Sequence, residues 1–140
     1  MAGILYNSGS SKQRNLISGV MTTTTTSEPL LGADKYAALC LHAKIGSIGG
    51  TSPTFNVRLQ QLAVDGTTWY DIASLTQMTG NGSRILGMVS GGNTEFAVTT
   101  GTLTAGTVHA VPFGASQRVH VTVGGTNPTA VVTVGIEYIE

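Results

Sequence analysis

Apolar and polar residues alternate along several short stretches of the chain. Residues 36–45 alternate between an apolar side, formed by Leu39, Leu41, Ala43 and Ile45, and a second side formed by Cys40, His42 and Lys44. A repeat of two residues is typical of a β-strand with one buried face. This stretch therefore predicts a strand that packs its leucine side against a core.

The same alternation returns at Phe55, Val57 and Leu59, with a polar residue after each of them. The glycine- and serine-rich residues 46–53 that lie between the two stretches predict a loop. Other stretches rich in β-branched residues predict strands at residues 16–26, 84–90, 95–99, 107–113, 118–123 and 129–138.

The dipeptide Asp65-Gly66 separates two extended segments within residues 64–72. Asp-Gly is typical of a two-residue hairpin turn of type I′, in which both central residues need a positive φ. The sequence therefore predicts a β-hairpin that turns at these two residues.

Glycine-rich breaks at residues 80–82, 91–93, 101–106 and 124–128 punctuate the predicted strands. No long stretch repeats with the period of an α-helix, so no crossover helices are available to join parallel strands. About eight or nine short strands with turns between them indicate an all-β fold, an antiparallel β-sandwich or jelly roll. The sandwich is predicted to be a single domain over residues 16–140.

Residues 1–15 are predicted to form an extended N-terminal arm. Ile4, Leu5 and Tyr6 make a short apolar patch, and a polar stretch follows that cannot bury enough apolar surface to order itself. The arm is expected to order on a neighbouring subunit, and a frayed terminus is the alternative. The opening residues lack the basic and long apolar regions of a secretion signal.

The charge content of the chain gives information about its role. Only 10% of residues are charged, against about 25% in typical domains, and seven basic residues balance seven acidic ones. No basic stripe points to nucleic acid, and no apolar run reaches the length of a membrane span. The single cysteine excludes an intrachain disulfide. Such a surface is typical of a subunit that is covered by neighbours in an assembly.

Groups for catalysis or metal binding are scarce. Cys40 and His42 share the outer side of their strand, but a Cys–His nucleophile also needs an orienting group and a cleft. His109 and His120 are predicted to face each other on adjacent strands, without a third ligand for zinc. The sequence therefore predicts no catalytic residue, no metal ligand and no cofactor.

Two carboxylates flank an aromatic pair, as in a sugar-binding patch. Asp65 and Asp71 lie on either side of Trp69 and Tyr70. The preferred interpretation is structural: Asp65 stabilises the turn, Asp71 caps a strand end or is solvated there, and Trp69 anchors the core.

Several segments resemble the structural proteins of tailed bacteriophages. They are the Phe-Asn-Val-Arg-Leu-Gln stretch at residues 55–60, the Asp-Gly-Thr-Thr-Trp-Tyr-Asp-Ile stretch at 65–72, residues 118–126 and the valine-rich final strand. Among these proteins, the chain is most similar to jelly-roll decoration, or cement, proteins of the capsid.

The resemblance implies a non-enzymatic virion protein on the exterior of the capsid, made in the host cytoplasm. Its expected partners are the major capsid protein and itself, as a dimer or trimer, with no nucleic acid, membrane or small-molecule substrate. The candidate contact residues are Ile4, Leu5, Tyr6, Thr22, Thr23, Thr24, Thr25 and Thr26, the threonines as an exposed strand edge. The alternatives are another head–tail or tail component, or a carbohydrate-binding β-sandwich.

Overall fold

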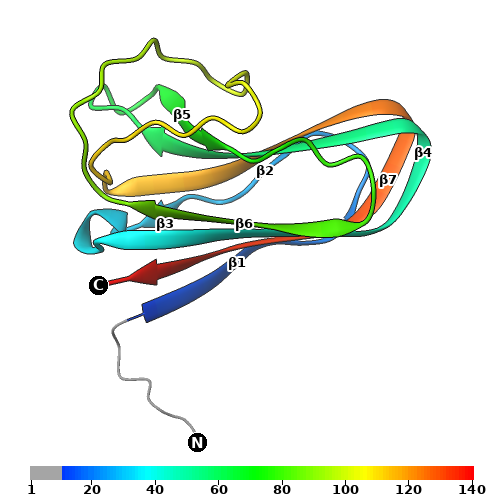
Figure 1. Ribbon diagram of the computed structural model, residues 1–140, viewed down its shortest axis with the longest axis horizontal. Coiled ribbons are helices and arrows are strands. Elements are labelled where there is room, and N and C mark those ends of the chain that lie inside the picture. The colour runs from blue at the N-terminus through cyan, green and yellow to red at the C-terminus, as the bar shows by residue number, and fades with distance from the viewer. Residues whose placement is uncertain (1–10) are drawn as a thin grey trace, which may run out of the picture.

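A computed structural model of the chain describes residues 11–140. These residues form a seven-stranded antiparallel sheet that folds over on itself into two layers (Figure 1). The strands are β1 (Ser11–Met21), β2 (Thr25–Thr26), β3 (Leu30–Leu31), β4 (Ala38–Leu62), β5 (Trp69–Ser74), β6 (Gly82–Val89) and β7 (Ser116–Ile139), and a 3-10 helix, η1, spans Ala33–Lys35. The predicted antiparallel sandwich is confirmed, while this strand order does not confirm a jelly roll.

The two longest strands, β4 and β7, run side by side through both layers and bend together between them (Figure 1). Residues 46–53 and 124–128, predicted as a loop and a turn, instead belong to these strands, so both predictions are wrong. Register shifts between Gly46 and Thr54 absorb the bend, and the two strands stay in continuous register on either side of it. Gly125 is needed there, because its φ is +104° and a Cβ would lie 2.6 Å from the carbonyl oxygen of Ser52.

Each layer uses half of β4 and half of β7. The first layer has the order β6–β4–β7–β1 and contains residues 38–46 of β4. The second layer has the order β5–β4–β7, with β2 and β3 on the far edge of β7, and contains residues 54–62 of β4. The pairing of β4 with β7 makes one folded sheet from what the sequence presents as separate strands.

The core lies between the layers and follows the alternation predicted from the sequence. Leu39, Leu41, Ala43 and Ile45 of the first layer and Phe55, Val57 and Leu59 of the second are all buried. From β7, Val119, Val121, Val132 and Val134 join them. Burying each of the larger of these side chains contributes about 1.5–3 kcal/mol, so this core can stabilise the fold without a disulfide.

The N-terminal strand begins earlier than predicted. Residues 11–15 pair with β7, with Ser11 opposite Ile139, and therefore belong to β1. Ile4, Leu5 and Tyr6 lie outside the described residues. The predicted strand at 16–26 is divided, because β1 ends at Met21 and β2 begins at Thr25.

Residues 90–115, which we call the covering loop, contain no strand, although strands were predicted at 95–99 and 107–113. The covering loop lies over the outer side of the second layer (Figure 1). It contacts β5 at separate points: the Asp71 amide donates to Thr99 O, and the His109 amide donates to Ile72 O, both at 2.8 Å. Pro112 has no amide to donate. These isolated bonds replace the continuous ladder that the valines and threonines predicted.

The predicted hairpin is confirmed, but its turn type is wrong. Strands β4 and β5 pair on either side of the turn, and Gly66 has a positive φ of 76° while Asp65 does not. The Gly66 amide donates to Ala63 O at 3.0 Å, so the turn starts earlier than a type I′ turn at Asp65-Gly66 would. The Asp65 carboxylate accepts the amides of Thr67 and Thr68 at 2.9 and 2.8 Å. Hydrogen bonds from Thr68 and Thr67 lower the pKa of Asp65 to about 2.

Candidate functional site

The residues considered for catalysis do not assemble into one site. Within residues 11–140, no three His, Cys, Asp or Glu side chains gather in a way that could hold a metal ion. Cys40 is partly buried and His42 is exposed, on the predicted outer side of β4. His109 stacks on Phe96 in the covering loop, with ring centres 3.9 Å apart. His120 lies on β7, whereas His109 is not on a strand. The prediction that these histidines face each other on adjacent strands is therefore wrong.

Asp71 is the most enclosed charged group of the second layer. It is 1% exposed, and its carboxylate accepts five hydrogen bonds. The donors are the amides of Gly101, Thr102 and Leu103 at 2.9, 3.0 and 3.1 Å, Thr99 Oγ1 at 2.9 Å and Gln60 Nε2 at 3.0 Å. The prediction of a cap or a solvated strand end is therefore wrong, because the covering loop closes over β5 at this point.

Two opposing effects set the pKa of Asp71. Burial raises it, because a carboxylate loses its water, whereas the hydrogen bonds led by Gly101 and Gln60 lower it by more. The net result is a pKa below the usual value, so Asp71 is a carboxylate at neutral pH. A charge enclosed by five donors holds the covering loop in place and has no oxygen free for acid–base chemistry.

Gln60 extends this cluster to Trp69. Gln60 Oε1 accepts Arg118 Nε at 2.8 Å, and the Arg118 guanidinium lies 4.3 Å from the centre of the Trp69 ring. This is the geometry of a cation–π contact. Trp69 is partly buried on the outer side of the second layer, so the prediction of a core anchor is wrong. One face of its ring is covered by arginine.

His120 sits beside the same cluster and bonds to the threonine segment. Its Nδ1 lies 2.9 Å from Thr26 Oγ1. Burial, followed by the positive charges of Arg118 and Arg58, lowers the pKa of His120. The imidazole is therefore neutral at pH 7.

A second polar cluster, which the sequence analysis missed, lies between the layers. Gln61 Oε1 accepts the Gly114 amide at 2.8 Å and Gln117 Nε2 at 3.0 Å, and the Tyr138 hydroxyl donates to Gln117 Oε1 at 2.5 Å. Burial raises the pKa of Tyr138. The sequence held one sign of this cluster, because glutamines stand at inward-facing positions of strands, where an unpaired amide would be costly.

The outer side of the first layer, which we call the bare face, differs from that of the second. Figure 1 shows no other part of residues 11–140 beyond this layer. Its exposed apolar side chains are 37% to 74% accessible and comprise Val20, Ile85, Val89, Val131 and Ile139. Leu31, Val64, Val98 and Val108 are also exposed, but lie on other parts of the molecule. Exposed apolar side chains are thus present on a sheet face that residues 11–140 leave uncovered.

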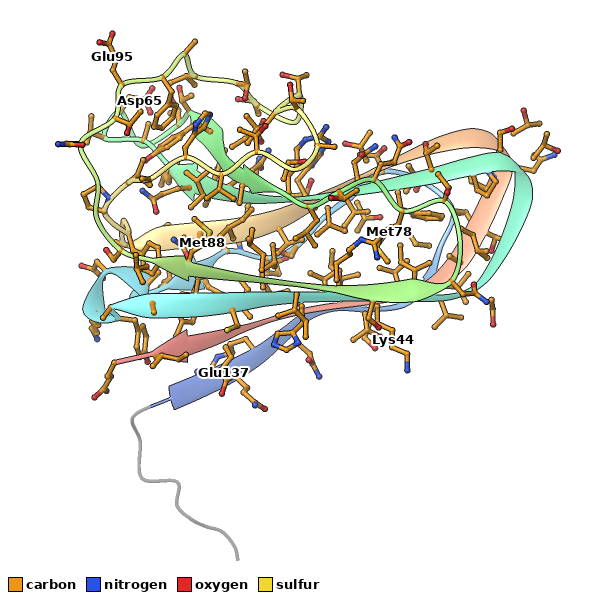
Figure 2. The ribbon with its side chains drawn as sticks, in the orientation of Figure 1. Lys44, Asp65, Met78, Met88, Glu95 and Glu137 are labelled. Carbon is orange, nitrogen blue, oxygen red and sulfur yellow. The ribbon has the colours of Figure 1, made fainter. Side chains whose placement is uncertain are left out.

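An open depression of about 340 Å³ lies at the centre of the bare face. Gly135 contributes to its floor, because a Cβ there would lie 2.9 Å from Arg14 O and 3.0 Å from Asn15 Oδ1. Figure 2 shows Lys44 and Glu137 pointing away from this layer, on the side opposite Met88 in the core. The depression is also lined by His42, Ile85 and Thr133.

The predicted threonine contacts lie elsewhere, on the edge of the second layer. Thr25 and Thr26 pair with β7 as β2, and Thr24 Oγ1 accepts the Val123 amide at 3.1 Å. Thr22 and Thr23 are exposed before this strand. The run therefore forms a short strand edge that is partly bonded to β7.

No protein-family model, curated protein or solved structure matches the chain. Among the described residues, no helix has the length and hydropathy that crossing a bilayer requires. Function is therefore inferred from the surfaces of the molecule itself.

Proposed function

We propose that this chain is a non-enzymatic virion structural protein that binds the outer surface of a phage capsid and cements neighbouring major capsid subunits. The bare face is the observation that carries a protein-binding role. Exposed apolar side chains at both ends and in the central row of a sheet face that residues 11–140 leave open are typical of a surface covered by another protein. The low charge of the whole chain supports the same role.

The positions of the reactive groups also favour binding over catalysis. Asp65 holds a turn, Asp71 holds the covering loop, and His120 bonds to Thr26. Each of these side chains makes at least one hydrogen bond within its own chain. A catalytic group would need an atom directed at a substrate.

The capsid as partner rests on the resemblance of four segments to phage structural proteins. Three of them, residues 55–60, 65–72 and 118–126, are neighbours in the second layer, because Gln60 pairs with both Asp71 and Arg118, whereas the final strand lies in the first layer. The same three side chains form the cluster under the covering loop. Three of the four segments that carry the resemblance thus form one structural unit, which supports treating them as a single pattern.

The carbohydrate-binding alternative is less well supported. A sugar platform needs an open aromatic face with accessible acids beside it, whereas Arg118 covers one face of Trp69 and Asp71 is buried. A head–tail or tail component would use the same surfaces as a cement protein. Its position in the particle distinguishes the two roles.

Addition of the purified protein to capsids that lack it tests the proposal. Electron cryomicroscopy should show added density on the outer surface, bridging neighbouring capsid subunits, and treated shells should resist heating better. Density at the neck or tail, or no binding, would contradict the cement role. A variant without residues 1–10 tests the arm while leaving β1 complete, and we expect weaker attachment with an unchanged fold.

A further inference from the structure

The outward side chains of the bare face form rows across the strands. Strand register places Ile85, His42, Gly135 and Asn15 in a central row. The next outward row toward one end of the strands contains Cys40 and Glu137. The next outward row toward the other end contains Lys44 and Thr133. The outermost rows contain Ala38, Val89 and Ile139 at one end and Gly46, Val20 and Val131 at the other.

The order of residue types in these rows is similar from either end of the face. Each end is apolar, each intermediate row has one charged residue, and the two charges, Glu137 and Lys44, are opposite in sign. A two-fold rotation about an axis along the central row exchanges the ends. It places the Lys44 row of one copy over the Glu137 row of the other, and the Val131 row over the Ile139 row.

We infer that the bare face binds a second copy of this chain through a two-fold interface. Lys44 of each copy pairs with Glu137 of the other, and Val131 packs against Ile139 across the interface. Such an interface uses one self-complementary patch on both subunits. The inference rests on the proposed function, because it specifies the surface and symmetry of the expected self-association.

A second copy fits this face better than an unrelated partner because the pattern complements itself. Opposite charges at equal distances from the central row give two ion pairs per dimer, with no like charges opposed. The chain has no net charge, so two copies do not repel at long range. The depression over Gly135 leaves room for the His42 side chains, which meet near the axis.

The size of the face indicates a weak dimer. Strands about 4.8 Å apart and rising about 3.3 Å per residue give a four-strand face of about 550 Å² when flat. A standard interface buries about 800 Å² on each partner. We therefore expect a dissociation constant in the micromolar range, with symmetry on a shell adding avidity.

Charge reversal tests the arrangement. In sedimentation equilibrium, Lys44→Glu and Glu137→Lys should each weaken the dimer by about 10- to 100-fold, because each introduces two like-charge contacts. The double variant should dimerise like the wild type. An equimolar mixture of the two single variants should also dimerise, since each then meets its opposite charge.

Two exposed residues away from the bare face provide matched controls. Lys35→Glu in η1 and Glu95→Lys in the covering loop make the same charge changes and should leave the dimer unchanged. Circular dichroism and thermal melting report whether each variant folds. If a reversal unfolds the chain, the neutral variants Lys44→Gln and Glu137→Gln should still weaken the dimer, by less.

Several results would overturn the inference. They are a wild-type chain that stays monomeric at about 1 mM, neutral and reversed variants that dimerise normally, and a mixture of single variants that stays monomeric. Shell binding is measured separately on the same proteins. Dimers that do not bind shells would contradict the capsid role alone, and monomers that bind shells would contradict the two-fold interface alone.

Discussion

The outward side chains of the two layers have different surroundings. On the second layer, Gln60, Asp71 and Arg118 point outward, and the covering loop closes over them with matching donors. On the bare face, the outward residues include Val20, Ile85, Val89 and Val131, which remain exposed. The outward polar side chains of the second layer are covered by the covering loop, whereas residues 11–140 leave the bare face, with its apolar ends and its charged Lys44 and Glu137, open.

This difference shows that outward polarity alone does not identify a solvated face. A carboxylate can be covered only where donors satisfy it, because an unpaired buried charge is very costly. Three consecutive amides of the covering loop donate hydrogen bonds to the Asp71 carboxylate and satisfy it. On the bare face, Lys44 and Glu137 remain accessible to solvent, and in the inferred dimer each meets an opposite charge, so a second copy can cover the face without leaving either charge unpaired.

Removing the carboxylate beneath the covering loop should have the largest effect. Asp71→Ala leaves the amides of residues 101–103 without an acceptor, and each unsatisfied buried donor costs about 1–3 kcal/mol. We expect the free energy of unfolding to fall by about 3–5 kcal/mol in urea titrations. Glu95→Ala, an exposed change in the same loop, should have little effect. Equal stability of the two variants would show that the covering loop does not depend on Asp71.

The equivalent test on the bare face targets its close approach to β1. In Gly135→Ala the new Cβ would press against the backbone of Arg14, and the strand would have to shift. We expect a loss of about 1–3 kcal/mol, as for overpacking elsewhere. Gly87→Ala provides the control on the same face, because nothing lies within 4 Å of its Cβ position. If both changes are tolerated equally, the floor of the depression is not constrained.

Acid should destabilise the second layer in two steps. The folded pKa of Asp71 is below its unfolded value, so its contribution is present above the unfolded pKa and is lost as the pH falls through the folded one. The folded pKa of His120 is also lowered, so the unfolded state binds the proton more readily. Stability should therefore begin to fall as the pH drops below about 6.5.

Denaturation at a series of pH values checks this order. His120→Gln should remove the step nearer pH 6.5, and Asp71→Asn should reduce the more acidic step, to which Asp65 also contributes because its pKa is lowered as well. Neither step should change in Lys44→Glu, whose substitution lies on the other layer. A pH profile that both of the first two variants leave unaltered would contradict the assignment of acid sensitivity to the second layer.

The smallest effect on stability is expected from charges on the bare face. Lys44→Glu and Glu137→Lys change exposed or partly exposed groups, and each should alter monomer stability by less than about 0.5 kcal/mol. Measurements at concentrations below the dimer dissociation constant check this. A large loss in the monomer would mean that the bare face, like the second layer, relies on its charges for folding.

Much of the fold follows from short patterns, and the errors have a common cause. The alternation in residues 36–45 correctly predicted buried and outward positions, because side-chain direction in a strand depends only on the local backbone. The glycines at 46–53 were misinterpreted as a loop because their pairing partners are about 80 residues away in β7. Asp71 was misassigned because its donors come from residues 99–103, far along the chain.

The sequence by itself determined the all-β class, the inward residues of β4 and the low charge of the surface. Those properties depend on composition and on a two-residue period, which neighbouring residues suffice to set. Only the tertiary structure decided that β4 and β7 form one bent sheet, that the covering loop closes over Asp71, and that Lys44 and Glu137 flank Gly135. These depend on long-range pairing between strands, where register decides which side chains share a face.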